Sequence, residues 1–158
     1  MREVLYSQLE QIQKDILNEA SLVMENAYNP YSNFYVGAAL LSHDGQIIGG
    51  TNMENAAYGS TICAERSAIL RANAMGIKRF SKVGIIARGQ GFDTTSVTGP
   101  CGGCRQMLFE SAQISGVNLE VIMSTTRRDK IIIATIEELL PLGFGPKELG
   151  IDISKYQK

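Results

Sequence analysis

The sequence predicts an α/β protein, in which a mixed five-stranded sheet lies between two layers of helices as a three-layer α-β-α sandwich. The alternation of predicted elements leads to this fold class, and the length and composition are compatible with it. Short apolar runs typical of strands alternate along the chain with longer stretches in which apolar residues recur at three- and four-residue steps, an arrangement typical of sheets covered on both faces. The 158 residues are 44% hydrophobic, which is enough for a substantial buried core.

The first elements are predicted to be one helix followed by a β-hairpin. Apolar residues at helical spacing predict an amphipathic helix over residues 4–27, and the turn-forming segment Asn29–Asn33 ends it. Two apolar runs follow, over 35–41 and 46–50, with the sequence Ser-His-Asp-Gly between them. An Asp-Gly turn between apolar runs is typical of a hairpin.

The rest of the chain alternates helices with strands. Helical spacing predicts three further helices, over residues 61–75, 104–112 and 136–140. Apolar runs predict three further strands, over residues 82–87, 119–124 and 130–134. The polar stretch 89–100, rich in Gly and Thr, is predicted to be a loop.

Composition narrows the functional class. No apolar run reaches the roughly 18–20 residues of a membrane span, and the amino-terminal stretch lacks the layout of a signal peptide. The formal net charge of −1 gives no global positive field to attract nucleic acid or anionic membranes. Because no repeat or linker-like stretch divides the chain, we expect one cytoplasmic domain over residues 1–158 that binds neither nucleic acid nor membrane.

Two short motifs contain all three cysteines of the chain. Thr61–Arg66 reads TICAER and contains Cys63, and Gly99–Gln106 reads GPCGGCRQ and contains Cys101 and Cys104. Each motif lies at the start of a predicted helix, where free backbone N–H groups and the helix dipole favour thiolates. Three thiolates can bind one Zn²⁺ and leave the fourth position open for a water, whose pKa the metal lowers to about 7.

Glu65 is the candidate proton carrier. It follows Cys63 by two residues, which places its carboxylate beside the metal rather than on it. A first ligand, any residue and Glu, followed later by Pro-Cys-x-x-Cys, is the signature of zinc base deaminases, and their ligand set can be three cysteines. Arg66 is positioned to offset the negative charge of the three thiolates.

Other readings of the cysteines fit less well. A Cys-x-x-Cys pair is also typical of redox and structural zinc sites, but thioredoxin-like chemistry needs neither a third cysteine nor a Cys-x-Glu. A closed structural zinc site needs a fourth ligand. The single histidine, His43, falls in the predicted Ser-His-Asp-Gly turn, where we expect it to face solvent. An open catalytic site therefore fits best.

Five motifs in order make the chain resemble the small, single-domain zinc-dependent cytidine deaminases. They are YSNFYVGAAL at 31–40, NMENAAYG at 52–59, CAER at 63–66, PCGGCRQ at 100–106 and LLPLGFGP at 139–146. The resemblance runs from about residue 27 to residue 149. The chain departs from it at Ala57 and Gly143, where many relatives have Ser, and the loop over 89–99 is longer than usual.

The resemblance implies a reaction and a cofactor. The reaction is hydrolytic deamination of cytidine and deoxycytidine to uridine and deoxyuridine in pyrimidine salvage, with one Zn²⁺ per subunit. The backbone N–H of Ala64 would read the base carbonyl, and the carbonyl of Gly99 would meet the leaving amine.

The resemblance also implies a substrate site shared between subunits of a homotetramer. Asn52 and Glu54 would bind a ribose hydroxyl, and Phe34 would pack against the pyrimidine. Tyr58 and Phe144 would reach into the site of an adjacent subunit. From the residues alone, Asn52 and Glu54 could equally shape a loop, and the three aromatic residues could simply be packed.

Two alternatives remain at the level of sequence. A deaminase of cytosine nucleoside analogues such as blasticidin would share the cysteine motifs, although the Phe144 motif fits the cytidine enzymes better. A catalytically silent zinc- or RNA-binding protein on the same fold is the alternative from another class. The intact Glu65 and the absence of basic tracts argue against it.

Overall fold

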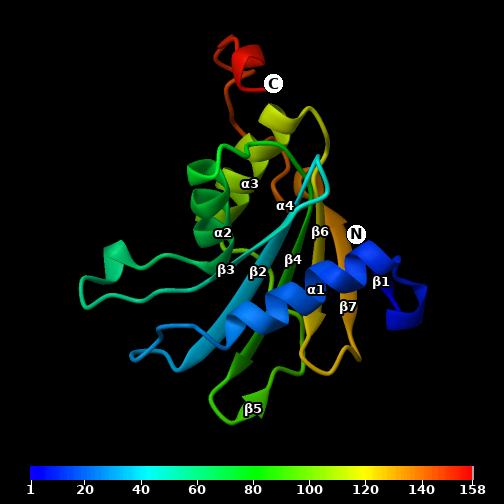
Figure 1. Cartoon of the computed structure of the whole chain (residues 1–158), viewed down its shortest axis with the longest axis vertical. Helices are drawn as coiled ribbons and strands as arrows, with labels where there is room; N and C mark the ends of the chain where they lie inside the picture. The colour runs from blue at the N-terminus through cyan, green and yellow to red at the C-terminus, as the bar shows by residue number, and fades with distance from the viewer. Residues whose placement is uncertain (158) are drawn as a thin grey trace.

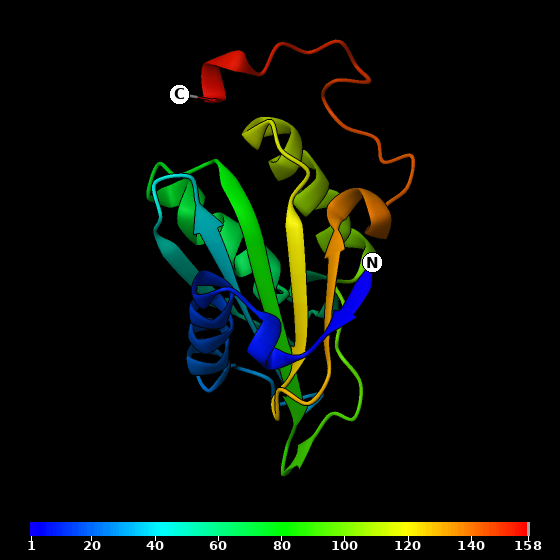
Figure 2. The ribbon, with the colours of Figure 1, turned by 90° about the vertical axis from the view of Figure 1, so that its right-hand side faces the viewer.

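A mixed sheet forms the middle layer of the molecule in the computed structural model, which describes residues 1–157 (Figures 1 and 2). The strands are β1 (Arg2–Val4), β2 (Phe34–Ser42), β3 (Ile47–Thr51), β4 (Phe80–Gly89), β5 (Phe92–Asp93), β6 (Glu120–Thr125) and β7 (Ile131–Thr135). Their order is β1-β7-β6-β4-β2-β3, and the short β5 pairs with β4. β4 and β6 run parallel, whereas the other pairs are antiparallel.

Helices cover both faces of this sheet. They are α1 (Gln11–Met24), α2 (Ala64–Ala74), α3 (Gly102–Ser115) and α4 (Ile136–Leu139). Alternate residues of β2 point to opposite faces: Ala38 and Leu40 join the apolar cluster of α2 and α3, while Ala39 and Leu41 join the cluster of α1. In Figure 1 α1 accordingly crosses the face opposite α2 and α3. The predicted three-layer sandwich is confirmed.

Two glycines of the hairpin let the helices approach the sheet closely. A Cβ on Gly37 would lie 1.8 Å from the carbonyl oxygen of Ala20 in α1. On the opposite face, a Cβ on Gly50 would lie 2.3 Å from the backbone nitrogen of Ala68 in α2. Only a residue without a side chain fits at either position, so these glycines fix the height of both helical layers above β2 and β3.

The predicted helix over 4–27 is wrong at its start. Residues 2–4 form β1, which pairs antiparallel with β7, and a short 3-10 helix follows over Tyr6–Gln8. α1 begins only at Gln11, because the side chain of Gln13 accepts a hydrogen bond from the backbone N–H of Glu10 at 2.9 Å and caps the helix there. Helical spacing of apolar residues could not reveal a pairing with a strand about 130 residues away.

The sheet also has seven strands rather than the predicted five. β1 is one addition, and β5 is the other, lying within the stretch 89–100 that was predicted to be a loop. Both additions are short edge strands, and they leave the class of fold unchanged. The predicted hairpin is confirmed, with Gly45 of its turn at φ +87°.

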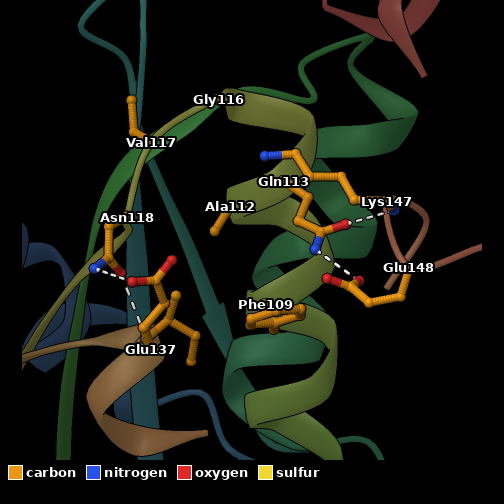
Figure 3. Close-up of a pocket in the computed structure, with 10 residues that line it drawn as sticks. Phe109, Ala112, Gln113, Gly116, Val117, Asn118, Glu137, Lys147 and Glu148 are labelled. Atoms are coloured by element: carbon orange, nitrogen blue, oxygen red, sulfur yellow. Dashed lines mark hydrogen bonds between the residues drawn. The ribbon is translucent and has the colours of Figure 1, made fainter. Parts of the chain in front are cut away.

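The last residues form a strap, here called the C-terminal strap (residues 141–157), that runs past α3 (Figure 2). Gln113 of α3 holds it by accepting a hydrogen bond from the backbone N–H of Lys147 and donating one to Glu148, both at 3.1 Å (Figure 3). Arg79 donates to the carbonyl of Gln157 near the end of the chain. No helix within residues 1–157 combines the length and apolarity needed to cross a membrane.

Candidate active site

The three cysteines come together where α2 and α3 begin. Cys63 is the N-cap residue of α2, Cys101 is the N-cap residue of α3, and Cys104 lies in the first turn of α3. Their sulfur atoms all lie within 4.8 Å of one another, and the Sγ atoms of Cys63 and Cys101 are 3.9 Å apart. Three cysteines separated by up to 41 positions in the sequence thus lie close together, because two neighbouring helices start at the same end of the sheet.

The spacing of the sulfurs fits a zinc ion. A tetrahedron with Zn–S bonds of about 2.3 Å separates its sulfurs by about 3.8 Å, close to the distance between Cys63 and Cys101. Within residues 1–157 this is the one cluster of metal-binding side chains found, and it does not include His43, which is exposed on the β2–β3 turn as predicted. Three protein ligands leave a fourth position open.

The cluster already favours a thiolate. A hydrogen bond from the thiol of Cys104, together with Arg66, lowers the pKa of Cys63 to about 5 against the opposing effect of burial. The pKa of Cys104 is raised, because its thiol gives that hydrogen bond to Cys63 and because it is buried. A divalent metal that binds the three sulfurs must therefore displace protons.

Arg66 lies between the cysteine cluster and the loop that precedes α2. Its Nη2 donates to the carbonyl of Thr61 at 2.8 Å and to Sγ of Cys63 at 3.8 Å. The guanidinium thus contacts a sulfur atom, in the position that charge compensation requires.

Glu65 is buried beside the sulfurs, with 4% of its surface exposed. Burial raises the pKa of its carboxyl group, and the negative charge of Cys63 raises it further. A carboxyl group with a raised pKa holds a proton more readily than an ordinary carboxyl group, as a residue that both accepts and gives protons requires.

A pocket of about 260 Å³ opens in front of the cluster. Six of the residues singled out from the sequence line it together with Cys63 and Cys101: Phe34, Asn52, Glu54, Ala64, Glu65 and Gly99. These residues come from β2, the segment after β3, the start of α2 and the loop before α3. Four parts of the chain therefore build one concave site around the sulfurs.

The side chain of Asn52 is already engaged with β2. Its Oδ1 accepts from the backbone N–H of Val36, and its Nδ2 donates to the carbonyl of Phe34, both at 2.9 Å. These two bonds fix which amide atom is oxygen and which is nitrogen. They use one of the two N–H groups of the amide, so the second is the donor that Asn52 can offer to the pocket.

Glu54 holds the loop before β2. Its Oε2 accepts from the backbone N–H groups of Tyr31 and Ser32, at 2.9 and 3.2 Å. Hydrogen bonds from Ser32 and Tyr31 lower the pKa of Glu54, so it is a carboxylate at neutral pH. Its other oxygen remains available as an acceptor, and Glu54 and Asn52 line the same pocket.

Tyr58 and Phe144 lie outside the pocket. Tyr58 lines an open depression of about 440 Å³ that shares Ser32, Glu54 and Thr61 with the pocket, and its ring packs edge-on against Tyr31 at 5.6 Å. The backbone carbonyl of Phe144 accepts from Nε2 of Gln106 at 2.7 Å, in the C-terminal strap. Within one chain, the structure does not bring Phe144 to the cysteines.

Four lining residues were not singled out from the sequence: Ser32, Val36, Thr61 and Thr98. Ser32 and Val36 flank Phe34 in the YSNFYVGAAL motif, and alternation along a strand could have identified Val36 because it points to the same side as Phe34. Thr61 opens the TICAER motif. Thr98 lies in the irregular stretch before α3 and has no local signal.

A second cavity lies away from the cysteines, between α3, α4 and the C-terminal strap (Figure 3). It measures about 300 Å³, and Phe109, Gln113 and Glu148 are among its lining residues. None of the residues singled out from the sequence lines this cavity. The candidate active site is therefore the smaller pocket, because it alone combines concavity with the sulfurs and Glu65.

The fold and the site together define the class of zinc-dependent base deaminases. The fold has three α/β layers, three thiols lie where two helices start, and the buried glutamate beside them is not a ligand. The family model described as "Cytidine and deoxycytidylate deaminase zinc-binding region" matches residues 10–120. The chain belongs to this family, and it carries the zinc-binding region that defines it.

The chain is also similar to curated proteins named cytidine deaminase. A cytidine deaminase of Halalkalibacterium halodurans is 39% identical over 134 residues, which are 85% of this chain and 95% of the relative. A cytidine deaminase of Sporosarcina psychrophila is 38% identical over 134 residues, covering 85% of this chain and 92% of the relative.

Solved structures agree in fold. The cytidine deaminase of Burkholderia pseudomallei superposes with a TM-score of 0.74 at 35% identity, covering 86% of this chain and all of that chain. The cytidine deaminase of Mycobacterium tuberculosis gives a TM-score of 0.66 at 33% identity, covering 84% of this chain and 96% of that chain.

Proposed function

We propose that this protein deaminates cytidine and deoxycytidine by hydrolysis, giving uridine or deoxyuridine and ammonia. The observation that carries the proposal is the buried carboxyl group of Glu65 beside three clustered thiols at the base of a nucleoside-sized pocket. Similarity to cytidine deaminases over most of the chain supports this substrate.

In this proposal Cys63, Cys101 and Cys104 hold one Zn²⁺ per subunit. The metal supplies the acidity that lowers the pKa of a water from 15.7 to about 7. Arg66 holds the Cys63 thiolate and offsets part of the negative charge of three sulfurs.

Glu65 moves the protons. It accepts one proton from the attacking water and gives it to the ring nitrogen next to the amino-bearing carbon. The oxygen then bonds to that carbon, and Glu65 carries the second water proton to the amine, which leaves as ammonia. Because Glu65 is buried, bulk water does not compete for these protons.

The pocket wall orients the base. The backbone N–H of Ala64 donates to the base carbonyl, and the carbonyl of Gly99 accepts from the departing amine. Phe34 packs against the pyrimidine ring. All three residues line the same pocket, which supports their acting on one bound ring.

Asn52 and Glu54 together suit a single sugar hydroxyl. The remaining N–H of Asn52 donates to it, and the remaining oxygen of Glu54 accepts its proton. We infer that this contact lies away from the 2′ position, so ribose and deoxyribose are both accepted. Turnover of cytidine and deoxycytidine at similar kcat/KM supports the inference, and a large bias toward one of them contradicts it.

The charge of the site favours a nucleoside over a nucleotide. The carboxylate of Glu54 lines both the pocket and its mouth, and no Lys, Arg or His joins it there among the described residues. A 5′-phosphate would enter a negative field without a partner, and such like-charge contacts cost several kcal/mol. We therefore expect kcat/KM for deoxycytidylate to be about 100-fold or more below that for deoxycytidine.

We also propose a single-domain cytoplasmic enzyme of pyrimidine salvage that acts as a homotetramer on free nucleosides. Tyr58, Leu142 and Phe144 are 74, 103 and 58% exposed, and large apolar side chains in such positions suit a subunit interface. In the tetramer, Tyr58 and Phe144 would complete the pocket of a neighbouring subunit. Light scattering of the eluted protein tests the mass, and a monomer would contradict this part of the proposal.

The central test follows ultraviolet absorbance of cytidine with the wild type, Glu65→Gln and Glu65→Ala, and measures zinc in each protein. We expect conversion to uridine by the wild type and a loss of about 100- to 10,000-fold in both variants with zinc retained. Wild type that holds zinc but leaves cytidine unchanged would overturn the substrate, and a blasticidin-type analogue would then be the next substrate to assay.

A further inference from the structure

Two arginines in the first turns of α2 and α3 fold back on the chain in the same way. Nη2 of Arg66 donates to the carbonyl of Thr61, and Nε of Arg105 donates to the carbonyl of Pro100, both at 2.8 Å. Each carbonyl belongs to the residue five positions before its arginine and precedes an N-cap cysteine by one or two residues. Both cysteine motifs therefore contain the same local contact, an arginine that donates to the carbonyl five residues before it.

A cation in the first turn of a helix is otherwise unfavourable. The amino-terminal end of a helix carries a partial positive charge, so Arg is better placed at the other end. Arg105 avoids this penalty by reaching out of α3: its Nη1 donates to the carbonyl of Leu139 at the end of α4, at 2.9 Å. That helix end is negative and has carbonyls without partners inside the helix, which suits a guanidinium.

Pro100 is buried, but no backbone hydrogen bond of Gly99 or Pro100 holds the segment among the described residues. Gly99 has no side chain to restrict its backbone, and Pro100 has no N–H to donate. The next residue, Cys101, must nevertheless present its sulfur to the cluster while Gly99 faces the pocket. A hydrogen-bond donor from outside the segment can fix the peptide between Gly99 and Cys101.

We propose that Arg105 is a positioning residue of the metal centre. By holding the Pro100 carbonyl against the end of α4, it keeps Sγ of Cys101 at the cluster and the Gly99 carbonyl at the pocket wall. Two donors in different directions are needed, and Arg has them whereas Lys offers one point charge. The proposal rests on the function proposed above, in which Cys101 is a metal ligand.

The experiment measures how fast a coloured chelator removes zinc from the protein, and the absorption spectrum after replacement of zinc by Co²⁺. Arg105→Met and Arg105→Lys are compared with Arg71→Met. Arg71 of α2 is the matched control, because its Nη1 also donates to a backbone carbonyl, that of Gly49 at 3.0 Å, outside the pocket lining.

We expect zinc release from Arg105→Met about 10- to 100-fold faster than from the wild type, with shifted Co²⁺ bands. Arg105→Lys should release zinc at a rate between those of Arg105→Met and the wild type. Arg71→Met should release zinc at the rate of the wild type. If Arg105→Met fails to fold, Arg105→Lys gives the result: faster release with an unchanged melting temperature supports positioning.

Wild-type release rates and Co²⁺ spectra in both Arg105 variants would overturn the inference, as would equal acceleration in Arg71→Met. Cys101→Ser separates this failure from failure of the proposed function. If Cys101→Ser keeps zinc as the wild type does, the ligand set itself is wrong. If Cys101→Ser loses zinc while the Arg105 variants keep it, only the positioning role is lost.

Discussion

At the scale of single residues, Asn52 shows how a residue proposed to bind the sugar can also be part of the scaffold. Its amide takes the place of a strand partner for β2, since β3 ends at Thr51 and Asn52 pairs with Phe34 and Val36 through its side chain. The same two bonds leave one N–H of the amide free, and Asn52 lines the pocket. Shaping the loop and binding the sugar, which stood as alternatives at the level of sequence, are therefore compatible roles for this residue.

Asn52→Leu should accordingly lower both stability and activity. The shape is nearly kept, but one N–H and one carbonyl of β2 lose their partner, at about 1–3 kcal/mol each in the free energy of unfolding. KM for cytidine should rise as well. Urea denaturation and steady-state kinetics measure the two effects.

Asn118→Ala is the matched control for that substitution. Asn118 is exposed, and its amide also bonds a neighbouring segment, at Glu137. We expect a loss below about 1 kcal/mol and an unchanged KM. If Asn52→Leu alters KM without altering stability, the two bonds to β2 contribute nothing to the fold.

The site could be predicted from the sequence wherever its geometry is local. Cys63 and Cys101 each begin a helix, and a helix start can be identified from a few residues, so the meeting of the cysteines followed from the order of elements. The structural role of Asn52 could not be predicted in this way, because its side-chain hydrogen bonds are made to another strand, β2. Phe144 is different again: its proposed role depends on a second subunit, and one chain leaves it in the strap.

At the scale of elements, the spacing between sheet and helices decides where the sulfurs lie. α2 rests on Gly50 through the backbone of Ala68 and Ala64, with contacts of 2.3 and 2.8 Å to a Cβ placed there. Because Cys63 is the N-cap residue of α2 and Glu65 lies in its first turn, any shift of α2 is transmitted to the site. Gly37 plays the same part for α1, on the face away from the cysteines.

Gly50→Ala and Gly37→Ala therefore form a matched pair. Each forces a helix away from the sheet, and such overpacking costs about 1–3 kcal/mol in the free energy of unfolding. We expect both to lose stability, but only Gly50→Ala to accelerate removal of zinc by a chelator and to lower kcat. Equal zinc release from the two variants would mean that α2 adjusts without moving its first turn.

The edge strand β1 marks the limit of prediction at this scale. Its three residues pair with Ile131–Ile133 of β7, a contact with no local signature. Periodicity starts the predicted helix at Val4, the last residue of β1, because Leu5 and Leu9 continue the apolar spacing, yet Leu5 is exposed and Leu9 is buried. Non-local pairing overrides local pattern most easily in short segments, where few helical hydrogen bonds are lost.

At the scale of the whole molecule, the proposed tetramer predicts that sites are shared between chains. The Glu65→Gln protein lacks the proton carrier but has an intact Phe144, and Phe144→Ala has the reverse. When the two are unfolded together and refolded, some pockets combine Glu65 of one chain with Phe144 of another. Activity should then exceed the sum of the separately refolded proteins, with a lower KM for cytidine than Phe144→Ala alone.

A second mixture gives the control for this prediction. Glu65 and Cys101 line the same pocket of the same chain, so mixing Glu65→Gln with Cys101→Ser can produce no complete site. Recovery in that mixture would point to an effect of refolding rather than to shared pockets. If neither mixture recovers activity while light scattering reports a tetramer, the subunits associate through another surface, and the role of Phe144 is confined to the C-terminal strap of its own chain.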